Sequence, residues 1–136
     1  MGQQQLLLIV LGVIIVGIAV VVGINVFTAS SSSSNRDAVI SDLTNLASLA
    51  QQYYRKPVAL GGGSNSFDGS GATGGNPWAI PGQLATTGNG SYTATVTATS
   101  VTLVGTGTQN GNDGSTPVKV TMVVGPNAIT STTIDN

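Results

Sequence analysis

LLLIVLGVIIVGIAVVVGINVF, residues 6–27, is the stretch that decides the architecture of this chain, because Asn25 is its only polar residue. As an α-helix rising about 1.5 Å per residue, the run would be about 33 Å long. A hydrocarbon core of about 30 Å needs a helix of roughly this length. The run therefore predicts a segment that lies in a membrane or in an equally apolar helical bundle.

A secretory signal peptide is the first alternative for this run. No Lys or Arg precedes it, it is longer than an h-region, and no small-x-small cleavage motif follows it. Myristoylation at Gly2 is also disfavoured, because position 6 is Leu rather than Ser or Thr. An ordinary transmembrane anchor stays open as an interpretation of the run.

The composition of the run bears on how stable its helix is. Twelve of its 22 residues are Val or Ile, and Gly12, Gly17 and Gly23 interrupt it. β-Branched residues lose rotamer freedom in a helix, and each glycine costs about 1 kcal/mol relative to alanine. We therefore expect local loss of helix between residues 12 and 23 once the segment is packed in an assembly.

A second helical pattern follows the serine-rich stretch TASSSSSN, residues 28–35, which is either a flexible linker or a continuing helix. Arg55 and Lys56 would suit the C-terminal end of this helix, and Pro57 would end it. Apolar residues recur at steps of four and three, the helical period: Val39, Leu43, Leu46, Ala50 and Tyr53. This amphipathic stripe needs a partner surface to cover it.

Residues 57–90 contain ten glycines and three prolines, so we expect mostly loop. Phe67, Trp78 and Ile80 are the side chains expected to anchor it. A long ordered loop in a small domain tends to be functional or packed against a partner.

From Ser91 the pattern changes to a period of two. Tyr92, Ala94, Val96 and Ala98 alternate with threonines, which predicts a half-buried strand with a threonine-lined outer face. The parity changes before Val101, which indicates a bulge or bend near Thr99-Ser100.

The rest of the chain predicts two more strands and two turns. The sequence QNGNDGS at 109–115 and Gly125-Pro126-Asn127 are both typical of turns. Between them, apolar residues alternate from Val118 to Val124, and a closing strand is expected from Ala128 to Ile134.

Together these patterns predict an α+β fold, a long N-terminal helix packed on a small antiparallel β-meander. The expected organisation is an N-terminal helix over residues 1–56, apolar over 1–27 and amphipathic over 28–56, a Gly-rich loop over 57–90, and the sheet over 91–136.

The chain has few side chains that could act as a nucleophile, general acid or general base, because it contains no His, Cys or Glu. Asn110, Asn112 and Asp113 offer oxygen ligands for calcium, but a plain hairpin turn is the favoured interpretation. A net charge of −1 without a basic cluster gives no footprint for nucleic acid. We expect no enzymatic activity, no catalytic residue, no metal site, no cofactor and no nucleic-acid partner.

The order of the expected elements resembles that of the type IV pilin and pseudopilin superfamily. The chain begins with an apolar helix, continues with an amphipathic helix ending in QQYYRKP, and then has a Gly-rich loop and a small antiparallel sheet. The resemblance implies that a peptidase of the inner membrane removes a short basic leader and leaves Met1 as the methylated first residue. It also implies that the apolar half-helices bundle in a filament core, with the other domains outside. The core residues would include Leu6, Leu7, Leu8, Ile9, Leu11, Ile14, Ile15, Ile18, Val22 and Phe27.

One position departs from the pattern of that family, which usually has Glu at mature position five, paired with the amine of the neighbouring subunit. Here the residue is Gln5. An amide accepts a hydrogen bond from that amine but supplies no charge, and it avoids the large cost of a buried carboxylate. Met1 and Gln5 would then form a neutral polar tip that contacts neighbouring subunits.

The function this predicts is that of a structural subunit of an extracellular, pilus-like helical filament. Its partners would be copies of itself, the inner membrane before assembly, and the assembly machinery. The alternative is a pseudopilin or another membrane-anchored component of a secretion system, built alike without forming long filaments.

Overall fold

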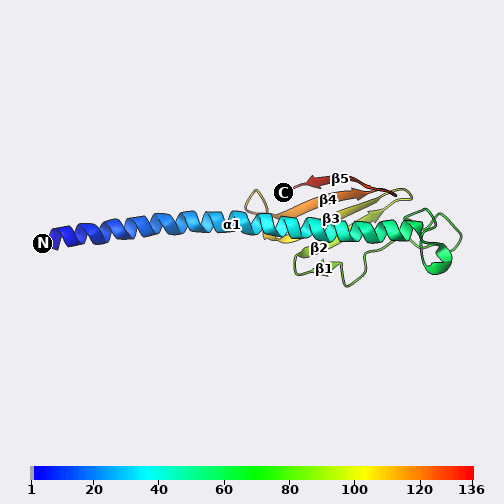
Figure 1. The fold of residues 1–136 in the computed structure, drawn as a ribbon, viewed down its shortest axis with the longest axis horizontal. Coiled ribbons are helices and arrows are strands. Elements are labelled where there is room, and N and C mark those ends of the chain that lie inside the picture. Colours follow the sequence, from blue (N-terminus) through cyan, green and yellow to red (C-terminus); the bar gives the residue numbers. More distant parts are fainter. Residues whose placement is uncertain (1) are drawn as a thin grey trace.

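The computed structural model describes residues 2–136 and confirms the α+β fold. Helix α1, Gly2–Arg55, is one continuous element of 54 residues. At about 1.5 Å per residue it is about 81 Å long. Its second half lies along one face of a five-stranded antiparallel sheet, and its first half projects away from the sheet (Figure 1).

The serine-rich stretch at 28–35 is helical, so α1 passes from its apolar half to its amphipathic half without a linker. The Thr28 hydroxyl donates to the Ile24 carbonyl at 2.9 Å, a bond to the preceding turn that keeps this hydroxyl compatible with a helix. Residues 12–23 are helical throughout the single chain. The expected loss of helix there concerns the packed assembly and stays a prediction.

The chain between helix and sheet is mostly irregular, as its composition predicts. It contains the short 3₁₀ helix η1, Val58–Leu60, and the two-residue strand β1, Thr86–Thr87. The remaining strands are β2 (Gly90–Val96), β3 (Val101–Asn110), β4 (Pro117–Val124) and β5 (Ile129–Ile134). The strands are ordered β1-β2-β3-β4-β5, so each pairs with its neighbour in the chain.

The parity change before Val101 coincides with a bend, one of the two irregularities expected near Thr99-Ser100. The chain reverses there in a tight turn between β2 and β3, and the Thr97 N–H donates to the Ser100 carbonyl at 2.9 Å. The Ser100 N–H in turn donates to the Thr97 hydroxyl at 3.1 Å. The expected bend is confirmed at Ala98-Thr99, but the chain also reverses there, so that the stretch expected as one bent strand forms two strands, β2 and β3.

The hydrophobic core lies between the second half of α1 and the inner face of the sheet. Helix residues Val39, Leu43, Leu46 and Ala50 are buried, and Tyr53 is half-buried at the edge of the cluster. The sheet contributes the alternating residues of its strands, namely Tyr92, Val101, Leu103, Val118, Val120, Met122 and Val124. From the loop, Phe67 and Trp78 are buried against the same core, and Ile80 is partly buried there.

Two glycines on the inner face of β3 let the helix approach the sheet closely. A Cβ on Gly105 would lie 2.6 Å from Val39 Cγ1 and 3.0 Å from the Tyr92 ring. A Cβ on Gly107 would overlap Asn35 Oδ1. Side chains here would push α1 away from the sheet, so the absence of Cβ atoms sets the spacing between helix and sheet at these positions.

Candidate assembly surface

The first half of α1 is a bare apolar helix. The chain from Leu6 to Phe27 has 17 large apolar side chains, and each is 53% to 75% exposed. All ten residues predicted for the filament core lie on this segment, and the structure brings none of them into contact with the sheet. The segment is apolar on every side, which is typical of a helix surrounded by lipid or by other helices.

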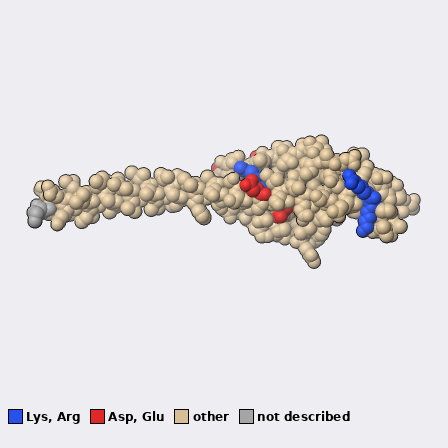
Figure 2. Space-filling model, viewed as in Figure 1, with Lys and Arg blue, Asp and Glu red and all other residues tan. Residues whose placement is uncertain are grey.

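The length and composition of this helix are sufficient to cross a membrane. Charged side chains are confined to the other end of the molecule, as Figure 2 shows, and Arg36 is the first of them along the chain. The absence of a charged face in the first half removes the main cost of placing it in hydrocarbon.

Gln5 lies in the first turns of α1 with its side chain exposed. The other half of the predicted polar tip, Met1, lies outside the described residues. Three glutamines at positions 3–5 therefore form an uncharged polar end on an otherwise apolar segment. Their side-chain amides carry donors and acceptors, and all three side chains are exposed.

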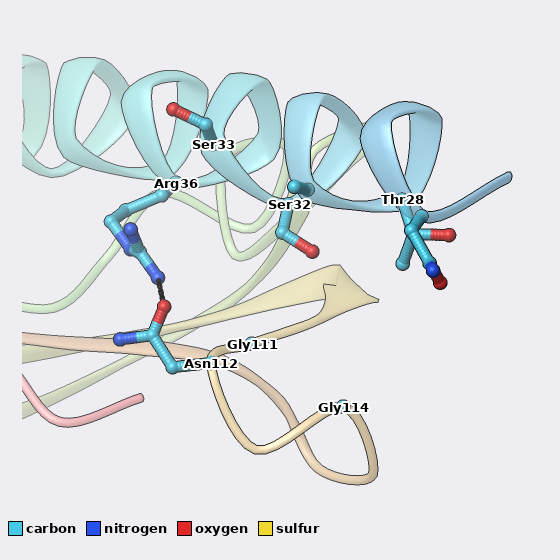
Figure 3. Close-up of a pocket in the computed structure, with 9 residues that line it drawn as sticks. Thr28, Ser32, Ser33, Arg36, Gly111, Asn112 and Gly114 are labelled. Atoms are coloured by element: carbon cyan, nitrogen blue, oxygen red, sulfur yellow. Dashed lines mark hydrogen bonds between the residues drawn. The ribbon is translucent and has the colours of Figure 1, made fainter. Parts of the chain in front are cut away.

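At the neck, where α1 leaves the sheet, the helix meets the loop between β3 and β4 (Figure 3). Arg36 Nη2 donates to Asn112 Oδ1 at 2.7 Å, and the Ser32 hydroxyl donates to the Asn110 carbonyl. These contacts border a cavity of about 330 Å³ that is lined by polar and small residues from the helix and the loop. The neck is therefore a polar contact between helix and loop. It separates the exposed apolar half of α1 from the hydrophobic core under the sheet.

Asn35 is the first buried residue of α1, and it fixes the helix to strand β3 and to the turn between β1 and β2. Its Nδ2 donates to the Asn89 carbonyl at 2.9 Å and to the Thr108 hydroxyl at 3.4 Å. Its Oδ1 accepts the N–H groups of Thr108 and Gln109 at 3.1 and 3.2 Å. Because both ends of the amide are satisfied, its burial carries no desolvation penalty from an unpaired group.

Asp42 makes a second polar contact between helix and sheet. Its Oδ2 accepts hydrogen bonds from the Tyr92 hydroxyl at 2.6 Å, Asn89 Nδ2 at 3.0 Å and the Thr87 hydroxyl at 3.1 Å. Burial alone would raise the pKa of Asp42, but these three bonds outweigh it and lower the pKa. Burial, reinforced by the bond to Asp42, raises the pKa of Tyr92 to about 12.

The hairpin loop considered as a calcium site uses its carboxylate internally. Asp113 Oδ1 accepts the N–H groups of Ser115 and Thr116, both at 2.9 Å, and Oδ2 accepts the Thr116 hydroxyl at 2.6 Å. The Thr116 bonds are the main reason that the pKa of Asp113 lies well below its ordinary value. Within residues 2–136, no group of three or more His, Cys, Asp or Glu side chains is placed to hold a metal ion.

No protein-family model matches the chain, and no curated protein or solved structure matches it either. The functional interpretation therefore rests on the exposed half of α1, its polar tip and the way the rest of the chain holds it.

Several residues that fix this arrangement were not identified from the sequence. Asn35 follows five serines and looks like part of a solvated stretch. Gly105 and Gly107 alternate with threonines, and that period-two spacing of residues without side chains was the available signal for a close approach. Asp42 lies on the helix face beside the stripe, and only the fold shows that Tyr92 reaches it.

Proposed function

We propose that this chain is the structural subunit of an extracellular filament of the type IV pilin kind. The apolar halves of α1 from many copies would form the core, and the sheets would lie outside. The observation that carries the proposal is that one half of α1 is apolar and uncovered, while its other half packs on the sheet of the folded domain. A chain of this form buries its largest apolar surface only by associating with something outside itself.

The energetics favour a partner over water by a wide margin. Burying one large aliphatic side chain contributes about 1.5–3 kcal/mol relative to leaving it in water. The segment from Leu6 to Phe27 carries many such side chains, all exposed in the single chain. Moving the segment from lipid into a bundle of identical helices changes its free energy little, because both surroundings are apolar. Packing and tip contacts would then decide whether the helix stays in the membrane or joins a filament.

The membrane stage follows from the same segment. We infer that α1 is inserted before assembly, with Leu6–Phe27 in the hydrocarbon and the sheet in water. The neutral tip at Gln5 can satisfy its hydrogen bonds with neighbouring tips or amines in the bundle without burying a charge. A subunit that left a released filament would expose its apolar segment to water, so a released filament should keep its subunits. Spontaneous shedding of soluble monomers in detergent-free buffer would contradict this.

Shearing cells, pelleting the extracellular fraction and imaging it by cryo-electron microscopy tests the proposal, with mass spectrometry of the same pellet. The expected result is a filament whose main component is this chain, with an apolar helical core. Methylation of Met1 would tie it to the type IV pathway.

The alternative is a pseudopilin or another membrane-anchored secretion component, because one uncovered apolar helix also serves as a single anchor. Retention of the chain in the membrane fraction as monomers, in cells that express it well, would exclude the filament and support this alternative.

A further inference from the structure

Polar residues lie at both ends of the apolar segment of α1, and within it only Asn25 is polar. At one end are Gln3, Gln4 and Gln5, whose side chains are exposed. At the other end is the neck, where the helix and the β3–β4 loop enclose a cavity of about 330 Å³. An amide without a hydrogen-bond partner is costly in a bundle of apolar helices, so the glutamine tip needs a polar partner there.

The neck cavity has walls of amides, hydroxyls and backbone, with one cation (Figure 3). One wall is a face of α1 between Asn25 and Arg36, and the other is the loop between Gly111 and Gly114. Arg36 Nη2 donates to the neutral amide oxygen of Asn112 at 2.7 Å. Among residues 2–136, Arg36 Nε has no hydrogen-bond acceptor, although it is shielded from solvent. The cavity wall therefore lacks an acceptor, and the side-chain oxygen of a glutamine is one.

The charges around this cavity favour a neutral occupant over an anion. Arg36 is followed in the chain by Asp37, and the facing loop carries Asp113, and both aspartates are exposed. The positive charge of Arg36 is therefore offset within the neck. An amide binds such walls through hydrogen bonds alone, without the larger desolvation cost of a charged group.

The length of the folded half of α1 places a glutamine tip at this cavity when chains are stacked. In the proposed filament all chains point the same way, so outer domains stacked end to end are displaced by at least the length of one domain. From Ser32, which bonds the end of β3, to Arg55, the helix rises about 35 Å. From Gln4 to Thr28, a residue of the cavity wall, it rises about 36 Å. A displacement of one domain therefore brings the tip of one chain beside the neck of the next.

We propose that the neck cavity binds the Gln3–Gln5 tip of a second copy of this chain, displaced along the filament by about 36 Å. This inference rests on the proposed filament and adds the contact that sets the axial offset between stacked subunits. The tip amides exchange hydrogen bonds with the amides and hydroxyls of the cavity wall. A much smaller displacement would leave the same amides beside Val and Ile side chains of the apolar segment, where they have no partner.

Disulfide trapping in filaments tests this contact, and the chain has no cysteine of its own. Each of Gln3→Cys, Gln4→Cys and Gln5→Cys is combined with Thr28→Cys in one full-length chain. Filaments sheared from cells are oxidised and separated on denaturing gels. Because each tip meets the neck of another chain, we expect at least one combination to give a ladder of covalent multimers.

The matched control combines the same tip variants with Ser30→Cys, which lies at nearly the same height on α1 but outside the cavity wall. The ladder from Thr28→Cys should be at least several-fold stronger, and a ladder no stronger than the control would overturn the proposal. Dimers at a similar yield from a tip cysteine alone would also overturn it, because tips would then meet tips. If the unaltered chain forms no filaments, the proposed function fails; if filaments form without the ladder, only the present inference fails.

Charge variants test the same contact without covalent trapping. Gln4→Lys would place an ammonium group beside the guanidinium of Arg36, and like charges repel, so filament yield should fall several-fold. Adding Arg36→Gln removes this repulsion and should restore most of the yield. Adding Lys56→Gln instead removes a charge just beyond the far end of α1 and should restore nothing. Equal yields from the two double variants would contradict the tip–neck contact.

Discussion

The two halves of α1 belong to one uninterrupted helix but have opposite relations to the rest of the chain. From Leu6 to Phe27, every large apolar side chain is more than half exposed. From Asn35 to Ala50, the residues that face the sheet are buried, and they recur at the helical period. The second half has its partner within the chain, and the first half does not.

The difference shows how the width of an apolar surface indicates where its partner lies. A stripe about one face wide, as at Val39, Leu43 and Leu46, fits a single sheet. A helix that is apolar on every side requires partners on every side, and one small domain has no further element to provide them. Changes that affect only one half should therefore separate folding from assembly.

Ile15→Lys should have the largest effect, because it places a charge in the middle of the apolar half. A lysine at the centre of a membrane helix costs about 2.5–3.5 kcal/mol on insertion scales, so we expect loss of membrane insertion and of filaments. Melting of the folded domain in detergent should not change. Gln52→Lys, on the exposed side of the second half, is the matched control and should still assemble. Normal filaments from Ile15→Lys would refute the division of roles.

Leu43→Ala should destabilise the folded domain by about 2–5 kcal/mol, because it leaves a cavity under a fully buried side chain. Urea unfolding in detergent, followed by fluorescence of Trp78, the single tryptophan, measures the change. Leu11→Ala makes the same truncation in the apolar half and should leave the unfolding midpoint unaltered. Equal destabilisation by both variants would mean that the first half contributes to folding.

Gly105→Ala should cost about 1–3 kcal/mol through overpacking, since its Cβ would lie 2.6 Å from Val39 Cγ1. The double variant Gly105→Ala/Val39→Ala should recover part of that loss, and thermal melts of the set measure it. Gly12→Ala is the comparison in the first half. A Cβ there meets nothing within 4 Å, so no destabilisation is expected.

Asp42→Asn should have the smallest effect, about 1 kcal/mol near neutral pH, because the amide still accepts some of the three hydrogen bonds. The folded state lowers the pKa of Asp42 below its ordinary value of 3.8. The carboxylate therefore stabilises the fold above pH 3.8, and this contribution is lost as the pH falls through the lowered pKa. Urea midpoints measured from pH 7 to pH 2 should show the two proteins converging; a constant difference would exclude this role.

The sequence was sufficient for the α+β fold class and for most of the core, but strand β1 lies in the region expected to be loop. The helical spacing from Val39 to Ala50 and the alternation from Val118 to Val124 each reflect one buried face, so periodicity alone identifies them. The bend near Thr99-Ser100 was expected, but the reversal of the chain there was not, because a change of parity is produced equally by a bulge and by a hairpin.

Contacts between distant elements could not be predicted from the residue pattern of any one segment. Asn35 and Asp42 are polar residues whose partners are 45 or more positions away in the chain. The exposure of β5 depends on relative widths, since a helix about 10–12 Å across covers only two or three strands spaced about 4.8 Å apart. The helix is therefore too narrow to cover β5 as well, and the sequence of β5 alone does not indicate that the strand is exposed.

The continuity of α1 through the neck has a mechanical consequence. In the proposed filament, a pull on the outer domain along the filament axis would reach the core through helical backbone, with no slack linker to extend first. Because the second half of α1 lies along the sheet, such tension loads the contacts from Asn35 to Gln51 in shear, so that they resist together and do not open one at a time. Under force, the domain should stay folded until that whole interface slides.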